Sequence, residues 1–413
     1  MCKNNNLLIL SIIFLSYFAS CTHVDDKESG IVSLKNDVGF LSDDNLEGRE
    51  IGTSGEKDAA RYISNRFKEL GLLPKGTDGY LQEFGFSPKK NPHDTSEDDG
   101  TSKVYGQNVI GYIDNGAPST IVIGAHYDHL GYGDDNSLHR GDSAIHNGAD
   151  DNASGVASLL LLAQITKGKN LNNNYLFIAL SGEEKGLYGS NFYTKNPTEE
   201  LEMVNYMINM DMVGRLNEEK ALAINGVGTS PGWTPNLEDI KVDSIKIVTS
   251  ESGVGPSDHT SFYLKDIPVL HFFTGQHEDY HKPSDDADKI NYEGLYSVTI
   301  FIDSLITRLD NDGKLEFTKT KDDSNDTPRF TVTLGVVPDY LFDGKGMRID
   351  GVSEDKPAQK AGLETGDVVI QLGEIEVVDM MSYMKALAEF KKGDATTVTV
   401  QRGNEKLSYP IQF

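Results

Sequence analysis

The stretch STIVIGAHYDH, residues 119–129, indicates the architecture of the chain. Its centre is continuously apolar from Ile121 to Ile123, which predicts a buried strand. The strand ends in polar residues, among them His126 and Asp128. A helix with a broad apolar face is then predicted over ASGVASLLLLAQITKG, residues 153–168. The chain thus runs from a buried strand, through a polar turn, into a helix.

The same alternation continues on both sides of this stretch. A helix with one apolar face is predicted within residues 55–72, and it stops at Gly71. A closing helix is predicted over 292–309. Further short apolar runs, each bounded by polar or glycine-rich turns, occupy 174–184, 204–214 and 267–273. Strands that alternate with helices predict an α/β sandwich around a mostly parallel sheet.

Two polar segments interrupt this pattern. Residues 87–103 have no apolar periodicity and are expected to form a surface excursion, and residues 311–328 have the composition of a linker. The expected organisation is a signal peptide over 1–20, a flexible tether over 21–30, an α/β domain over 31–310, the linker, and a small domain of strands and turns over 329–413.

The composition limits the classes of function. The chain has 413 residues, enough for two or three domains, and 38% of them are hydrophobic. Its formal net charge of −26 excludes a general binder of nucleic acids or anionic membranes, which needs basic patches. The two cysteines, Cys2 and Cys21, lie at the N-terminus and leave no internal disulfide framework.

The N-terminus has the features of an export signal. One lysine precedes an apolar run from Leu7 to Phe18, which is too short for a comfortable membrane span. The sequence FASC at 18–21 resembles the bacterial lipoprotein cleavage box, with Phe18 in place of the usual leucine. This resemblance implies a lipidated Cys21 and an exported protein anchored to a bacterial membrane, at the periplasmic face or the cell surface. The alternative is an ordinary signal peptide with an incidental cysteine.

Acidic and histidine side chains follow the predicted strands. The set comprises His126, Asp128, Asp150, Asp151, Glu183, Glu184, Asp211 and His281. Ligands of open α/β sheets bind outside the carboxyl ends of the strands, so these side chains are expected to meet there. Carboxylates and imidazoles without thiolates suit Zn, Mn or Co. Each motif alone is a weak signal, because an Asp pair can also form a turn or cap a helix; their joint occurrence predicts a metal site.

Taken in order, the motifs resemble those of the co-catalytic zinc aminopeptidase family, in the clan of glutamate carboxypeptidase. The resemblance covers about residues 38–310 and rests on GAHYDH (124–129), GADDNASG (148–155), SGEEKGLYGS (181–190), NMDMVG (209–214), SDHTSF (257–262) and YHKPSDD (280–286). It implies a three-layer α/β/α zinc-exopeptidase fold that binds two zinc ions, with Mn or Co as alternatives.

The resemblance also implies a role for each matching residue. One zinc would be bound by His126, Asp150 and Asp211, and the other by Asp150, Glu184 and His281, so that Asp150 bridges both. Asp151 would serve the backbone geometry, next to a cis bond between residues 150 and 151. Glu183 would be the general base and acid, and Asp128 would orient the imidazole of His126.

Two further residues keep open roles. Tyr280 is either a stabiliser of the tetrahedral intermediate or a wall of the site. Asp258, in the SDHTSF motif, either shapes the substrate pocket or holds a loop.

The C-terminal region resembles a PDZ domain of the bacterial protease type. The segments TLGVVPDY (333–340) and KPAQKAGLETGDVV (356–369) carry the resemblance. PDZ domains bind an extended C-terminus by strand addition, and the matching carboxylate-binding loop is Leu334, Gly335 and Val336, with residues from Met381 onward beside the groove. The alternative is a structural module with a blocked groove.

These features together predict an exported metallo-aminopeptidase that acts on peptides, with no nucleic-acid partner and with membrane contact through lipid only. A carboxypeptidase is an alternative, because the metal site does not say which peptide end is read. A glutaminyl cyclase is less favoured, because those enzymes carry tryptophan before the last His ligand, where this chain has Tyr280; its only tryptophan is Trp233. A catalytically inactive peptide-binding protein is disfavoured by the complete set of ligands.

Overall fold

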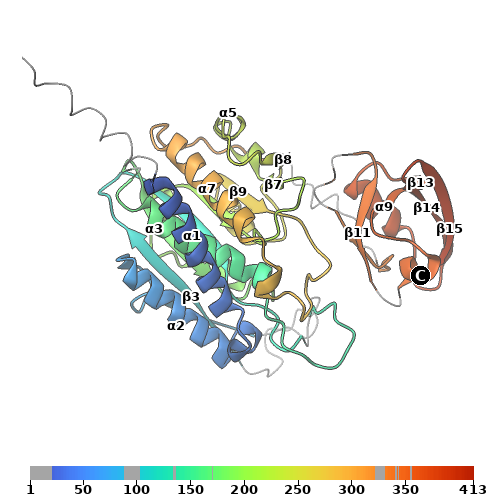
Figure 1. Cartoon of the computed structure of the whole chain (residues 1–413), viewed down its shortest axis with the longest axis horizontal. Helices are drawn as coiled ribbons and strands as arrows, with labels where there is room; N and C mark the ends of the chain where they lie inside the picture. The colour runs from blue at the N-terminus through green and yellow to red at the C-terminus, as the bar shows by residue number, and fades with distance from the viewer. Residues whose placement is uncertain are drawn as a thin grey trace, which may run out of the picture.

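The computed structural model describes residues 21–87, 103–133, 136–169, 171–320, 331–339, 342, 344–353 and 356–413. The expected signal peptide, most of the 87–103 segment and residues 321–328 of the expected linker therefore lie outside the described residues. Two units follow each other along the chain, an α/β unit that extends to about residue 320 and a smaller β-rich unit after it (Figure 1).

The first unit contains a large mixed sheet. Within the described residues its strand order is β1-β3-β5-β4-β6-β9-β7-β8, with β2 paired to β3. The central strands β5, β4, β6 and β9 are parallel, as expected, whereas β1, β2 and β3 pair antiparallel at one side. The strands are β1 (Leu73–Pro74), β2 (Leu81–Phe86), β3 (Val104–Ile113), β4 (Thr120–His126), β5 (Asn174–Leu180), β6 (Val204–Met210), β7 (Ala221–Asn225), β8 (Lys246–Ser250) and β9 (Val269–Phe273).

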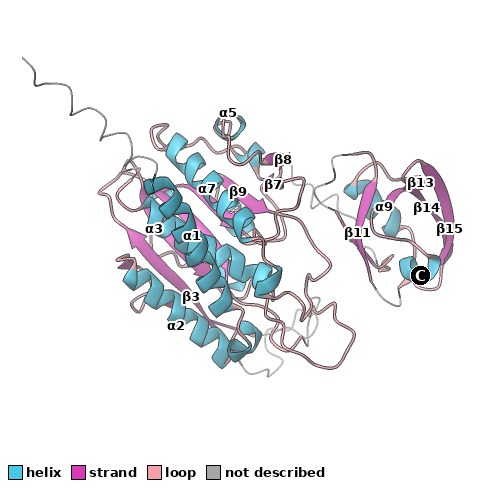
Figure 2. Cartoon of the chain, in the orientation of Figure 1, coloured by secondary structure: helices cyan, strands magenta, loops and turns pink. Residues whose placement is uncertain are grey.

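Helices cover both faces of this sheet (Figure 2). On one face, α3 packs on β4, β5 and β6, and α1 and α7 pack on α3. On the other face, α4 and α6 pack on β3, β6 and β9. The helices are α1 (Cys21–Leu41), α2 (Ser54–Glu69), α3 (Gly155–Thr166), α4 (Tyr188–Lys195), α5 (Trp233–Glu238), α6 (His259–Tyr263) and α7 (Tyr292–Leu309). This arrangement confirms the three-layer α/β/α sandwich.

The central strands are buried on both faces, which explains their unbroken apolar sequences. Every residue of β4, β5 and β6 is buried. Side chains alternate along a strand, so Ile121 and Ile123 join the core under α1, α3 and α7, while Val122 joins the core under α4 and α6. Parallel strands packed in this way place their carboxyl ends along one edge of the sheet.

Two segments differ from the expectation. Residues 21–30, expected as a flexible tether, are the first turns of α1. Gly30 packs where α1 crosses α7, since a Cβ there would lie 2.6 Å from the Tyr296 ring. The first half of the expected linker is docked as well, because Leu315 is buried and the Thr318 N–H donates to the Thr229 carbonyl.

The second unit has its own sheet and core. Its described strands run in the order β10-β11-β12-β14-β15, with β13 paired to β12, and all pairs are antiparallel. The elements are β10 (Val336–Pro338), β11 (Met347–Val352), α8 (Pro357–Ala361), β12 (Val368–Leu372), β13 (Ile375–Glu376), α9 (Met380–Ala388), β14 (Ala395–Arg402) and β15 (Glu405–Gln412). A capping box of Asp379 and Ser382 starts α9.

Among the described helices, none is long and apolar enough to cross a membrane.

Candidate metal centre

The carboxyl ends of the parallel strands bring the expected side chains together. His126 is the last residue of β4, Glu183 and Glu184 follow β5, and Asp211 follows β6. His281 lies in the loop between β9 and α7. All five line one cavity of about 450 Å³. The expectation that these residues meet at one edge of the sheet is therefore confirmed.

Asp151 occupies the centre of the group. Its Oδ1 lies 3.3 Å from His126 Nε2, and its Oδ2 lies 3.3 Å from His281 Nε2. Each of these histidines also lies near a second carboxylate. Asp211 Oδ1 is 3.4 Å from His126 Nε2, and Glu184 Oε2 is 3.3 Å from His281 Nε2. One carboxylate thus faces two histidines through its two oxygens.

These separations fit metal ligands. Zn–N and Zn–O bonds of about 2.0–2.2 Å in a tetrahedron place neighbouring ligand atoms about 3.3–3.6 Å apart. The four contacts measured above, at 3.3–3.4 Å, match that spacing. Two groups of candidate ligands are found in the described part of the chain, His126–Asp151–Asp211 and His129–Asp151–Glu184, and both contain Asp151.

The sequence-based choice of Asp150 as the shared ligand is wrong in this geometry. The Asp150 carboxylate accepts a 2.6 Å hydrogen bond from the Gly214 N–H and lies 3.1 Å from His277 Nε2. The two aspartates of the turn η2 (Ala149–Ser154) thus have separate neighbours, and Asp151 is the one whose carboxylate faces His126 and His281. The cis peptide bond is also one position further on, between Asp151 and Asn152.

Asp285 fixes the orientation of this turn. Its carboxylate accepts hydrogen bonds from the backbone N–H groups of both Asp150 and Asp151, at 3.0–3.1 Å. Burial, followed by the repulsion of Asp150, raises the pKa of Asp285 to about 6. The residue belongs to the same YHKPSDD motif as His281, so one loop supplies both a candidate ligand and the clamp that aims Asp151.

Arg49 holds the two loops that carry the centre. Its guanidinium is fully buried and donates to the carbonyls of Tyr127, Asn147 and Gly148, as well as Leu41. The first three acceptors come from the loop after β4 and from the turn that leads into Asp151, and Leu41 is the last residue of α1. Sequence reasoning did not identify Arg49, because a lone arginine in a turn gives no sign of which distant carbonyls it will reach.

His129 is a further residue of the centre that sequence reasoning missed. Its Nδ1 lies 2.7 Å from Glu184 Oε1 and 3.9 Å from Asp151 Oδ2, and the ring is buried. The 2.7 Å separation is that of a direct hydrogen bond, which leaves Glu184 Oε2 facing His281. His129 closes the GAHYDH motif, so the available signal was a second histidine three residues after His126.

Asp128 contacts both His126 and Glu183. His126 Nδ1 faces the backbone carbonyl of Asp128 at 3.2 Å, whereas the Asp128 carboxylate is 3.7 Å from the same nitrogen. The carboxylate instead accepts the backbone N–H of Glu183 at 3.2 Å. An Nδ1–H that donates to the carbonyl leaves the Nε2 lone pair of His126 directed at Asp151 and Asp211.

Glu183 lies beside the candidate ligands. It is part of the cavity wall, and no close contact with a histidine is found for its carboxylate in the described structure. Burial, and then repulsion from Asp211, Glu184 and Asp258, raises the pKa of Glu183 well above its usual value despite the attraction of His126. A raised pKa suits a group that accepts and then releases a proton.

The two residues with open roles are now placed. Tyr280 lines the cavity, and its ring stacks on that of His281 with centroids 3.8 Å apart. Asp258 does not line the cavity; it is buried at the start of α6, where burial raises its pKa to about 7. Asp258 thus belongs to the support behind the centre rather than to the pocket surface.

Beyond the acidic and histidine residues, the cavity has a mixed lining. The remaining wall comes from β7, β8, β9 and the loops beside them, and it includes Ala223, Asn225, Ser250, Pro256, His271, Phe273 and Gln276. The Asn225 side-chain amide donates to His271 Nδ1 at 3.2 Å. No lysine or arginine lines the cavity among the described residues.

The expected carboxylate-binding loop lies in the second unit. The Gly335 and Leu334 carbonyls accept from Ser353 and Ala358, and the Gly335 N–H donates to Thr333 Oγ1. Gly335 has φ +78, and a Cβ there would lie 2.0 Å from the Lys356 side chain, so the position requires glycine.

Comparison with known proteins agrees with this geometry. Residues 108–304 match the model of peptidase family M28, and residues 316–412 match that of the PDZ domain. Aminopeptidase YwaD of Bacillus subtilis is 29% identical over 191 residues, which cover 43% of this chain and 38% of that protein. The chain therefore aligns with well under two thirds of the length of this curated relative.

Solved structures show the same fold. BSAP, a zinc aminopeptidase from Bacillus subtilis, superposes with a TM-score of 0.54 at 19% identity, over 70% of this chain and 96% of the other. A glutaminyl cyclase of Bacteroides thetaiotaomicron bound to N-acetylhistamine superposes with a TM-score of 0.52 at 18% identity, over 68% and 97%. The sequence matches and the cluster of candidate metal ligands together show that the chain carries an M28 peptidase domain followed by a PDZ domain.

Proposed function

We propose that the protein is an exported metallo-aminopeptidase that removes N-terminal residues from peptides. The observation that carries the proposal is the Asp151 carboxylate, whose two oxygens face His126 on one side and His281 on the other. His126, Asp151 and Asp211 would hold one zinc ion, and Asp151, Glu184 and His281 a second, with Mn or Co as alternatives. Such ions, when bound, polarise a scissile carbonyl and lower the pKa of water.

Glu183 is the proposed general base and acid. Its carboxylate lies beside the ligands and is half-buried, and its backbone N–H donates to the Asp128 carboxylate, which anchors the loop that carries it. It accepts a proton from the attacking water and delivers that proton to the nitrogen of the leaving peptide. General acid–base catalysis of this kind contributes typically about 10²–10⁴-fold in rate. Tyr280 forms the adjacent wall against which the reacting carbonyl is placed.

The lining of the cavity favours the amino end of a peptide. Asp151, Glu183, Glu184 and Asp211 line it, and among its described lining residues there is no lysine or arginine to bind a terminal carboxylate. Two bound zinc ions would offset the charge of these four carboxylates, so the preference rests on the missing cationic side chain: a C-terminal carboxylate would find no lysine or arginine to pair with. The aminopeptidase is therefore preferred to a carboxypeptidase, in agreement with the name of the Bacillus relative.

Product analysis on a peptide panel tests the proposal. With zinc present, peptides with a free α-amine should lose one residue at a time, and their N-acetylated counterparts should remain intact. Equal cleavage of both would refute the aminopeptidase and point to a carboxypeptidase or endopeptidase.

A glutaminyl cyclase is the second candidate, because one of the solved structures of this fold is such an enzyme. The residue before His281 is Tyr280, not the tryptophan that cyclases carry there. A peptide with N-terminal glutamine separates the two activities. A cyclase releases ammonia and keeps the chain length, whereas an aminopeptidase releases free glutamine.

We further propose that the protein is lipid-anchored through Cys21, on the strength of the FASC sequence. Cys21 is also the first residue of α1, so an acyl chain on it would tie the peptidase domain closely to a membrane. Metabolic labelling with a fatty acid should mark the protein and should fail to mark Cys21→Ser. Label that persists in Cys21→Ser would contradict the assignment.

The PDZ domain is proposed to bind peptide C-termini through Leu334, Gly335 and Val336. The glycine requirement at Gly335 supports a shaped loop of this kind. Binding of a labelled peptide acid that exceeds binding of its C-terminal amide would support the groove as a carboxylate site.

A further inference from the structure

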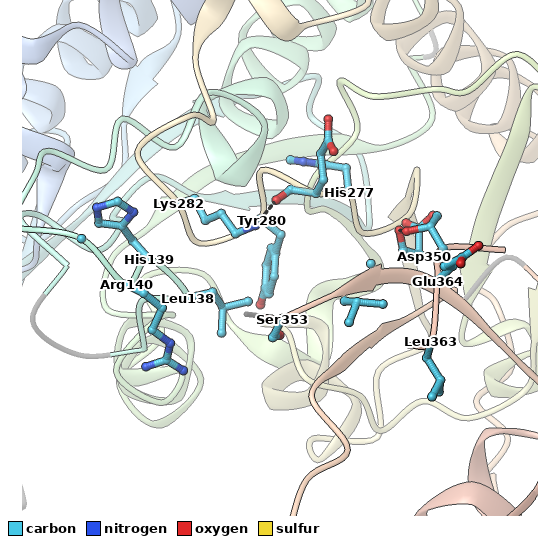
Figure 3. A pocket seen from close by; sticks show the side chains of 15 residues that line it. Leu138, His139, Arg140, His277, Tyr280, Lys282, Asp350, Ser353, Leu363 and Glu364 are labelled. Atoms are coloured by element: carbon cyan, nitrogen blue, oxygen red, sulfur yellow. Dashed lines mark hydrogen bonds between the residues drawn. The ribbon is translucent and has the colours of Figure 1, made fainter. Parts of the chain in front are cut away.

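A cleft of about 720 Å³ lies between the two domains (Figure 3). One wall is formed by the peptidase-domain loops around residues 138–141 and 277–282. The other wall belongs to the PDZ domain, at the end of β11 (residues 350–353) and the turn after α8 (residues 363–365). Both domains are therefore needed to form this cleft.

The cleft adjoins the metal centre. Tyr280 lines both the cleft and the cavity that holds the candidate ligands, and it stacks on His281. The facing loop is tied to the same histidine, because the Leu138 N–H donates to the His281 carbonyl at 3.0 Å and His281 Nδ1 lies 2.9 Å from the Asn136 carbonyl. Tyr280 and the 138–141 loop thus connect the cleft to the metal centre.

The peptidase-domain wall carries basic side chains on a strongly acidic protein. Arg140 is exposed, and within the described part of the chain no ion pair or hydrogen bond to its guanidinium is found. Lys282 directs one of its three ammonium donors to the Glu278 carbonyl, at 2.6 Å. On the PDZ wall, Glu364 pairs with Arg402 at 2.9 Å. Among the described lining residues, Arg140 is thus the guanidinium whose donors are all available to a ligand.

We infer that this cleft binds the part of a peptide substrate that lies C-terminal to the scissile bond, with the PDZ domain as its far wall and Arg140 as the group that binds a carboxylate there. The inference rests on the proposed aminopeptidase. The carboxylate belongs either to the C-terminus of a short peptide or to an acidic side chain, because a guanidinium pairs with both in the same bidentate way. Peptides that extend into the cleft should then be hydrolysed with a higher kcat/KM than substrates that have no residues C-terminal to the scissile bond.

The first test compares substrates that differ only in this carboxylate. The zinc-loaded full-length protein is assayed with Leu-Ala-Gly-Gly as the free acid and as the C-terminal amide, and with Leu-Ala-Asp-Gly amide against Leu-Ala-Asn-Gly amide. The wild type should favour the charged member of at least one pair, and the pair that shows the preference identifies the source of the carboxylate.

In the substrate pair that shows the preference, kcat/KM for the charged member is divided by kcat/KM for the uncharged member. Arg140→Ala should reduce this ratio by about two- to fivefold, mainly through KM, as for a solvent-exposed ion pair. The matched control is Arg61→Ala, which removes an exposed guanidinium from α2. A ratio that does not differ between Arg140→Ala and Arg61→Ala would overturn the role of Arg140.

The second test addresses the PDZ wall. Ser353→Trp places a large side chain in the cleft from the PDZ side, and Ser408→Trp places the same side chain on β15, away from the cleft. Leucine p-nitroanilide serves as the reference substrate, because it has no peptide chain beyond the scissile bond. Only Ser353→Trp should lower kcat/KM for the tetrapeptides, and the fall should be at least about fivefold larger than the fall for leucine p-nitroanilide. Equal behaviour of the two tryptophan variants would overturn the composite cleft. Absence of hydrolysis of every substrate by the wild type would overturn the proposed function, and this inference with it.

Discussion

The adjacent aspartates of the 148–155 turn offer a matched pair of substitutions. Asp150 and Asp151 are both buried, yet Asp150 faces the Gly214 N–H and His277, whereas Asp151 faces His126 and His281. Replacing each with asparagine removes one negative charge and keeps the side-chain volume. The two variants therefore differ only in which set of neighbours loses the charge.

Asp151→Asn should lose metal. Changes to groups that merely orient a ligand typically weaken metal affinity by about 10–100-fold. Asp151 contributes an oxygen to each candidate ligand set, so its loss should weaken binding by more than about 100-fold. The variant should then lack the gain in stability that zinc gives the wild type, which is about 2.7 kcal/mol at a free zinc concentration of 100 Kd.

Asp150→Asn should keep its metal but become less stable. The new amide oxygen still accepts from the Gly214 N–H, but the charged contact with His277 at 3.1 Å is lost. Burial lowers the pKa of His277, while the hydrogen bond and charge of Asp150 outweigh it and raise that pKa. Loss of a hydrogen bond between charged groups costs about 1.5–3 kcal/mol, by which the free energy of unfolding should fall.

Metal analysis of the two purified variants, with urea unfolding in the presence and absence of zinc, decides between these outcomes. Asp150→Asn should show the full zinc-dependent gain in stability from a lower starting value, and Asp151→Asn should show little or none. If Asp150→Asn loses its metal while Asp151→Asn retains it, the assignment of Asp151 as the shared ligand is wrong.

Three further predictions follow from the centre. Glu183→Gln should keep its metal content while kcat falls by about 10²–10⁴-fold, whereas Glu184→Gln should lose metal as well as activity; a Glu183→Gln variant with near-normal kcat would exclude it as the base. Arg49→Lys should lower the free energy of unfolding by about 2–4 kcal/mol, because an ammonium has only three donors at one point and cannot satisfy all four buried carbonyls that the guanidinium reaches, and an unchanged urea midpoint would count against this clamp. A chelator should abolish peptidase activity and lower the unfolding temperature, and added zinc should restore both; activity that survives complete removal of metal would contradict a metallopeptidase.

Much of the fold could be predicted because the evidence for it is local. Continuous apolar runs such as Ile121–Ile123, each followed by a helical pattern, predict buried parallel strands with helices on both faces, and the structure confirms this. The convergence of His126, Glu184, Asp211 and His281 was also predictable. Carboxyl ends of parallel strands meet at one edge whatever the details of the loops.

Contacts between segments far apart in the chain could not be predicted from such local patterns. Gly30 and Leu315 lie in polar segments that have no visible periodicity, yet the tertiary structure docks them against α7 and the large core. The free energy of such docking comes from partner surfaces far away in the sequence, at Gly232 for Leu315 and at Tyr296 for Gly30, so the local pattern does not show it.

The sequence by itself therefore determined the chemistry of the site, since residue type and order alone place imidazoles and carboxylates at the strand ends. Only the tertiary structure decided which atoms face one another. Whether Asp150 or Asp151 enters the cavity depends on the Asp285 clamp and the Gly214 N–H, which come from other loops and fix the direction of the turn. The same reason explains His129, whose hydrogen bond to Glu184 exists only once β4 and β5 lie side by side. Side-chain direction in an irregular turn is set by long-range hydrogen bonds, and these are absent from the linear pattern.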